Sequence, residues 1–142
     1  MAHVDTQLNT SRLIGRWQRS ADRVQVNIEG CERMLERNHE LLKLLTEKYF
    51  VSNKRIIVLK ETVRFIENEF VINIDDIDNM ANMIIELMDK KDGHNALALI
   101  PTMKNIKETC LLFMSRLDTH KQNVADFENV MNRTRRLVLD SE

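Results

Sequence analysis

The sequence contains few of the residues that make turns, with three glycines and one proline among 142 residues. A β-sandwich or an α/β sheet needs a turn about every ten residues, and Gly and Pro are prominent among the residues that form these turns. The chain has too few of them for such folds. We therefore predict an all-α protein built from long helices, as one domain over residues 1–142.

Motifs that carry chemistry are also absent from the sequence. It contains no Gly-rich phosphate loop, no Cys-x-x-Cys pair and no His-Glu-x-x-His element, the patterns of nucleotide, redox and zinc sites. The sequence therefore indicates no catalytic residues, no cofactor and no metal. We expect a protein that is not an enzyme.

Long apolar runs, excess charge and paired cysteines are missing as well. No apolar run approaches the ~18 residues of a membrane span, and residues 1–11 lack the charged start and apolar stretch of a signal peptide. The formal net charge of -1 offers no basic excess for nucleic acid. Cys31 and Cys110 lie far apart in the sequence, which favours reduced thiols in a core. We expect a cytoplasmic protein with no membrane span and no nucleic-acid partner.

What the sequence does contain is a sustained 3-4 spacing of hydrophobic residues, the pattern of a coiled coil. In the first half, every position of this series except Asn38 and Ser52 is hydrophobic: Ile14, Trp17, Ala21, Val24, Ile28, Cys31, Leu35, Asn38, Leu42, Leu45, Tyr49, Ser52, Ile56, Leu59, Val63, Ile66 and Phe70. The register does not slip, so we predict one helix over residues 11–71. At ~1.5 Å per residue, the seam is about 85 Å long.

Two further helices are predicted after this one. The β-branched run at residues 71–74 ends the first helix, and Asp75 can cap a second over residues 76–91, which Gly93 ends in a left-handed conformation. Pro101 suits the first turn of a third helix over residues 101–139. Its series is hydrophobic except at His120 and Thr134: Leu99, Met103, Ile106, Cys110, Phe113, Leu117, His120, Val124, Phe127, Met131, Thr134 and Val138.

Two arrangements of this long, short and long helix remain open. The stretch from Ile77 to Val138 is slightly longer than that from Ile14 to Phe70, so the last two helices could retrace almost the whole first helix as an elongated antiparallel hairpin. Alternatively, the third helix reverses at Gly93 and completes a compact three-helix bundle. We favour the hairpin.

A second apolar stripe runs beside the first seam and is made of six residues: Met34, Leu41, Leu44, Val51, Val58 and Phe65. A two-stranded hairpin buries one seam per helix and would leave this stripe in water. Burying each such side chain is worth about 1.5–3 kcal/mol. The stripe therefore predicts a binding site for a partner helix or for another copy of the chain. The alternative is that the chain's own third helix covers it.

Four arginines recur at helical spacing and form a second candidate partner-binding set: Arg12, Arg16, Arg19 and Arg23. In a hairpin, Arg133, Arg135 and Arg136 would lie at the same end, and the acidic residues between 67 and 78 would lie at the other. Such a rod would dock with a preferred orientation. The alternative is a solvated surface.

A few polar residues need separate interpretation. Glu36 and His39 match one Glu-x-x-His element of di-iron bundles, but those sites need a second copy and further carboxylates. His120 is expected to be a hydrogen-bonded core residue, and Asn38 and Ser52 to set the register between helices.

The order of the elements, with Ala98-Leu99-Ile100-Pro101-Thr102-Met103 opening the last long helix, resembles the smallest subunit of the dynactin shoulder over residues 24–138. This resemblance implies a helical subunit that bundles with larger dynactin chains in dynein-based, cytoskeletal transport. It carries over no functional residues, since that family has no catalytic site.

Together these features predict a non-catalytic coiled-coil subunit or adaptor of an intracellular complex, binding helical partners or itself through heptad seams. The alternative is a self-contained helical-bundle regulator, such as a pathogen effector that binds a single host protein.

Overall fold

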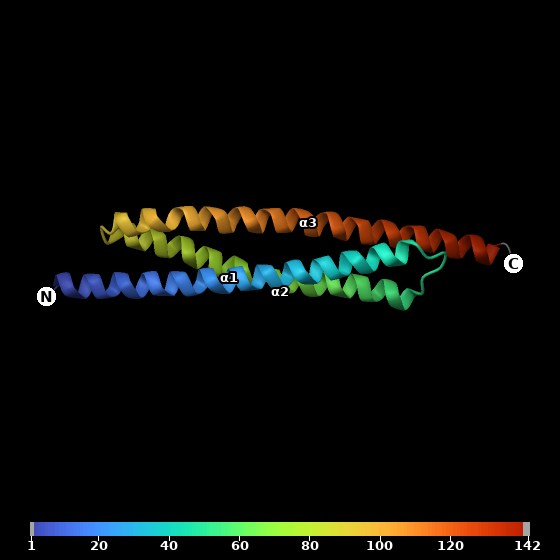
Figure 1. Cartoon of the computed structure of the whole chain (residues 1–142), viewed down its shortest axis with the longest axis horizontal. Helices are drawn as coiled ribbons and strands as arrows, with labels where there is room; N and C mark the ends of the chain where they lie inside the picture. The colour runs from blue at the N-terminus through green and yellow to red at the C-terminus, as the bar shows by residue number, and fades with distance from the viewer. Residues whose placement is uncertain (1, 141–142) are drawn as a thin grey trace.

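The computed structural model describes residues 2–140, with side chains described over residues 9–139. They form three helices, α1 (Ala2–Thr46), α2 (Asn53–Asp89) and α3 (Gly93–Asp140), and no strand occurs within this range. The prediction of an all-α fold is thus confirmed. Figure 1 shows an elongated bundle in which α2 runs antiparallel to both α1 and α3. The beginning of α1 and the end of α3 lie at opposite ends of the bundle. No helix within residues 2–140 has an apolar stretch long enough to cross a bilayer.

The predicted continuous helix over residues 11–71 is wrong, because the chain leaves the helix after Thr46 and enters α2 at Asn53. Residues 49–51 are aromatic or β-branched and are weak helix formers. Ser52 is extended, with φ -66° and ψ 151°. Its carbonyl oxygen accepts bonds from the backbone N–H groups of Arg55 and Ile56 at 3.1 and 3.4 Å, which start the new helix.

The connecting loop is tied to the far end of α3 by Arg135. Its guanidinium donates to the Val51 carbonyl oxygen at 2.7 Å and to Asn53 Oδ1, and lies 5.5 Å from the centre of the Phe50 ring. Val51 points into the core, whereas Tyr49, a predicted seam residue, is 97% exposed. Within the loop, the Val51 side chain is therefore buried in the core, whereas the Tyr49 ring is fully solvated.

The predicted turn at residues 71–76 is also wrong, since α2 runs straight through it. Asn73 is buried and donates from Nδ2 to Asn27 Oδ1 of α1 at 2.8 Å. Asp76 accepts a hydrogen bond from the guanidinium of Arg23 of α1 at 3.1 Å, which forms an ion pair. The helix propensity of β-branched residues is lower by only a few tenths of a kcal/mol each, so packing against α1 outweighs it.

The second reversal lies at residues 90–92, and the expected helices over residues 76–91 and 101–139 do not match the observed bounds. Lys91, with φ 59°, takes the left-handed conformation that we expected at Gly93. The N–H of Asp92 donates to the Leu87 carbonyl oxygen at 2.9 Å, and the Asp92 carbonyl oxygen accepts from Ala96 at 3.1 Å. Pro101 therefore lies inside α3 rather than in its first turn.

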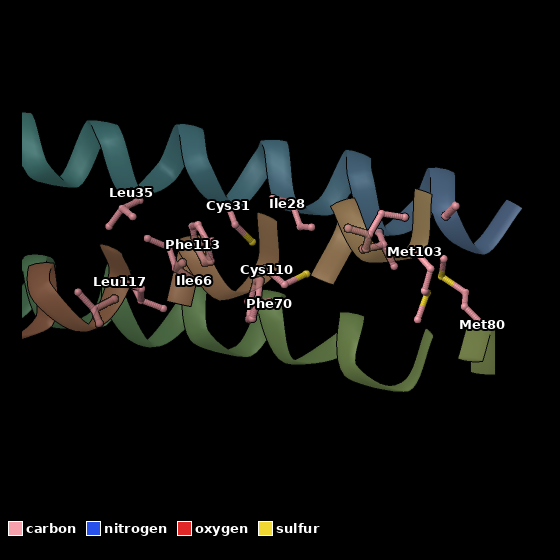
Figure 2. Close-up of a cluster of buried hydrophobic side chains, with 14 of the residues drawn as sticks. Ile28, Cys31, Leu35, Ile66, Phe70, Met80, Met103, Cys110, Phe113 and Leu117 are labelled. Carbon is pink, nitrogen blue, oxygen red and sulfur yellow. The ribbon is translucent and has the colours of Figure 1, made fainter. Parts of the chain in front are cut away.

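With two reversals, the chain forms a three-helix bundle in which each helix contacts both others, and the hairpin that we favoured is wrong. The bundle is a rod rather than the compact body of the alternative (Figure 1). Its core runs the length of the helices, and Figure 2 shows a central part in which Phe113 of α3 meets Phe70 of α2, with ring centres 4.8 Å apart.

Both cysteines are free and buried in this core. Burial, with the nearby negative charges of Glu69 and Glu32, raises the pKa of the Cys31 thiol to about 11. Burial also raises the pKa of Cys110. Both side chains therefore act as small apolar residues of the core.

Candidate partner-binding surface

The structure divides the predicted apolar stripe between α1, the loop and α2. Met34 and Leu41 of α1 are half-buried and pack against the core. Val51, a residue of the loop, is buried in the core and so cannot contact a partner, contrary to our prediction. Val58 and Phe65 of α2 are exposed. Leu44 is exposed as well.

Four of these residues flank the same face of the bundle because α1 and α2 are antiparallel. Asn27 and Ile72 line one shallow, mainly apolar hollow between the two helices. Seven residues form two helical turns, so the next equivalent positions are Met34 and Phe65, and the next again are Leu41 and Val58. The reversal at residues 47–52 thus brings the two halves of the stripe together.

We call the resulting surface the α1/α2 strip; it consists of Met34, Leu41, Val58, Phe65 and Ile72 of this series, together with Val26, which lines the same hollow as Asn27. Val26 and Ile72 are exposed and were not predicted. Ile72 could have been found, because it lies seven residues after Phe65. Leu44 falls outside this series. Contiguous apolar residues on a surface mark binding sites more often than isolated ones do.

The predicted arginines lie along the first half of α1, before the strip begins at Val26. Arg23 donates to Asp76 at 3.1 Å and to Ser20 at 2.9 Å. The other three are exposed, and no ion pair among the described residues involves them: Arg12, Arg16 and Arg19. Because α1 and α3 run in the same direction, Arg133, Arg135 and Arg136 lie at the opposite end of the rod, so the predicted separation into a basic and an acidic tip is wrong.

A polar layer crosses the middle of the core and involves all three helices. Asn38 of α1 donates from Nδ2 to the Leu59 carbonyl oxygen of α2 at 3.2 Å and to His120 Nε2 of α3 at 2.8 Å. Since an amide nitrogen only donates, Nε2 accepts, and the proton of the neutral ring is on Nδ1. Nδ1 is buried, and no partner for it occurs among the described residues.

The pKa of His120 is lowered, first by burial and second by the neighbouring His39, whose ring centre is 6.0 Å away. The folded state therefore favours the neutral form of the His120 ring. In the unfolded chain the pKa of this histidine is 6.5. The His120 contribution to stability is thus present above pH 6.5 and is lost as the pH falls below it. Protonation would also place an N–H at Nε2 against the Asn38 amide.

We expect the free energy of unfolding to fall between pH 7 and pH 5, by at most about 1.4 kcal/mol per pH unit for one proton. Urea titrations over this range measure the slope. The variant His120→Gln should lose most of it. His94→Gln, which changes an exposed histidine in the first turn of α3, should keep it. An equal slope in all three proteins would contradict the assignment.

Within the described residues, no three His, Cys, Asp or Glu side chains are grouped so that they could hold a metal ion. Glu36 and His39 are exposed and line a hollow between α1 and α3 with His120. The chain matches no known protein family, and no curated protein and no solved structure is detectably similar to it. The surface itself is therefore the basis for a functional proposal.

Proposed function

We propose that this protein is a non-catalytic helical subunit or adaptor, which binds a helix of a partner protein on the α1/α2 strip. The observation that carries the proposal is the apolar series at seven-residue spacing on both helices: Met34 and Leu41, half-buried on α1, and Val58, Phe65 and Ile72, exposed on α2. An amphipathic helix laid along two antiparallel helices buries such a series in the manner of a four-helix bundle.

Charge and shape along α1 further specify the partner helix. Arg33 and Arg37 are exposed on α1, as are the unpaired arginines of its first half. Gly30 lies four residues after Val26 and four before Met34, and an added Cβ there would meet nothing closer than 3.9 Å. Glycine costs a helix about 1 kcal/mol relative to alanine, and here it permits close approach of another backbone. We infer a partner helix with one apolar face and an acidic flank.

Affinity purification of the tagged chain from its native cells, followed by quantitative mass spectrometry, tests this proposal. Phe65→Glu places a charge in the strip, and Gly30→Gln fills the open position. The matched control is Val130→Glu on α3, because Val130 is 51% exposed and Phe65 is 53% exposed. We expect Phe65→Glu and Gly30→Gln to lose the co-purifying proteins and the control to retain them. An unchanged set of proteins for all three variants would refute the strip as the binding site.

The resemblance to the smallest dynactin shoulder subunit supports a cytoplasmic complex of dynein-based transport as the setting. A self-contained regulator that binds one protein is the second candidate, and it is favoured by the continuous core that the three helices bury within one chain. The same purification separates the two, since a subunit should recover several proteins in fixed ratio and a regulator should recover one.

A further inference from the structure

The outer face between α2 and α3, on the side away from α1, changes character along the rod. In the half near the α1–α2 loop, ion pairs bridge the two helices: Lys60 to Glu128 at 3.1 Å and Lys121 to Glu67 at 2.8 Å. With Arg64 and Ala125, these residues line a hollow between the helices. They identify which positions of each helix face outward here.

Steps of seven residues extend those positions into the half near the α2–α3 turn. On α2 they give a 3-4 series: Val71, Ile74, Asp78, Ala81, Ile85 and Met88. On α3 they give a second: Leu97, Ile100, Lys104, Lys107, Leu111 and Met114. We call these two series the outer seam. Apart from the half-buried Ala81, its members are exposed.

Each series has apolar ends and a charged centre, and the charges of the two centres are opposite. Asp78 and its neighbour Asp75 supply acid on α2, and α2 has no lysine or arginine after Arg64. Lys104 and Lys107 supply base on α3. All four are exposed, and none joins an ion pair within residues 9–139.

The register of the two helices places these centres at the same height. The contact between Phe70 and Phe113 and the turn at residues 90–92 align them antiparallel. Asp78, eight residues beyond Phe70, is therefore level with the position eight before Phe113, between Lys104 and Lys107. The apolar ends match as well, because Val71 is level with Leu111 and Ile85 with Leu97.

We propose that a second copy of this chain docks on the outer seam around a two-fold axis parallel to the rod. This operation keeps every height and exchanges the two helices, so that α2 of each copy lies on α3 of the other. Asp75 and Asp78 then meet Lys107 and Lys104, and the apolar ends meet apolar ends. A closed, two-fold interface of this kind is self-complementary.

The opposite orientation, with each helix on its own copy, is disfavoured by the same charges. It would place the acidic α2 on a second α2 and the basic α3 on a second α3. Like charges across an interface suppress that arrangement. The outer seam lies on a different face from the α1/α2 strip, so dimerisation and binding of a partner helix are compatible and can fail independently.

Sedimentation velocity of the purified chain, across micromolar to millimolar concentration, tests the dimer. We expect the wild type to dimerise and to dissociate as salt is raised, because screening weakens the exposed charges. The variant Lys104→Glu/Lys107→Glu makes the centres of both series acidic and should raise the dissociation constant of the dimer more than about tenfold. Lys43→Glu/Lys48→Glu changes the net charge equally on exposed residues outside the seam and should dimerise as the wild type does.

A charge exchange then tests the orientation. Asp75→Lys/Asp78→Lys should also prevent self-association. Combining all four substitutions in one chain should restore it, because the centres of the two series are then again opposite in charge. Circular dichroism verifies that each variant is helical. A wild type that stays monomeric, a Lys104→Glu/Lys107→Glu variant that dimerises normally, or a fourfold variant that stays monomeric would each overturn the proposal.

Discussion

Replacing Phe113 by alanine is expected to lower the free energy of unfolding by about 3–5 kcal/mol, the range for large-to-small changes at aromatic core positions. Phe113 is 1% exposed, and its ring packs against that of Phe70 with centres 4.8 Å apart (Figure 2). The substitution removes this pair and leaves a cavity between the helices. Because a domain has only about 5–15 kcal/mol of stability in total, such a loss is severe.

Urea unfolding followed by circular dichroism measures the effect of Phe113→Ala as a shift in midpoint at constant slope. The control is Leu112→Ala at the adjacent residue of α3, which is 61% exposed and should change stability by less than about 0.5 kcal/mol. A similar, small effect at both positions would mean that α3 does not pack on α2 as described.

Removing the Asn38 side chain should produce the second large effect. Asn38→Ala leaves His120 Nε2 without its donor and removes the second hydrogen bond to the Leu59 carbonyl oxygen, which keeps its bond within α2. Each buried polar group left without a partner costs about 1–3 kcal/mol. We therefore expect a loss of about 1–3 kcal/mol, measured by urea unfolding at pH 7.5, where His120 is neutral.

The double variant Asn38→Leu/His120→Leu should behave differently from either single change. It replaces both partners by apolar groups, which is often neutral or stabilising. The layer would then no longer favour one alignment of the three helices, as single buried polar residues do in coiled coils. We expect restored stability with poorer NMR dispersion or mixed oligomers. A double variant as unstable as Asn38→Ala would instead show that the layer contributes net stability.

Most of the buried positions of α1 and α2 could be predicted from spacing, but the break between these helices could not. The series Leu45, Tyr49, Ser52, Ile56 passes through residues 47–52 without losing phase, because the loop happens to contain the number of residues that keeps the spacing. The spacing of hydrophobic residues alone therefore does not indicate this reversal. The local signals were the weak helix propensity of residues 49–51 and the adjacent Ser52 and Asn53, which are typical N-cap residues, and a similar signal at residues 71–74 predicted a turn that packing against α1 overrides.

Only part of the candidate surface could be predicted, and the reversal of the chain again explains why. The stripe from Met34 to Phe65 was detected as one line on one helix, yet its two halves meet only because the chain reverses between Leu41 and Val58. Its loop member, Val51, is buried by the same reversal. The outer seam shows the same 3-4 spacing but has charged centres, so a search for uninterrupted apolar stripes passes over it.

An odd number of helices has a consequence for how the rod can be used. The beginning of α1 and the end of α3 lie at opposite ends (Figure 1), whereas an even number would return the chain to its starting end. The 48 residues of α3 alone span about 72 Å at ~1.5 Å per residue. Groups attached at the two ends would therefore be held apart at a set distance and in a set direction.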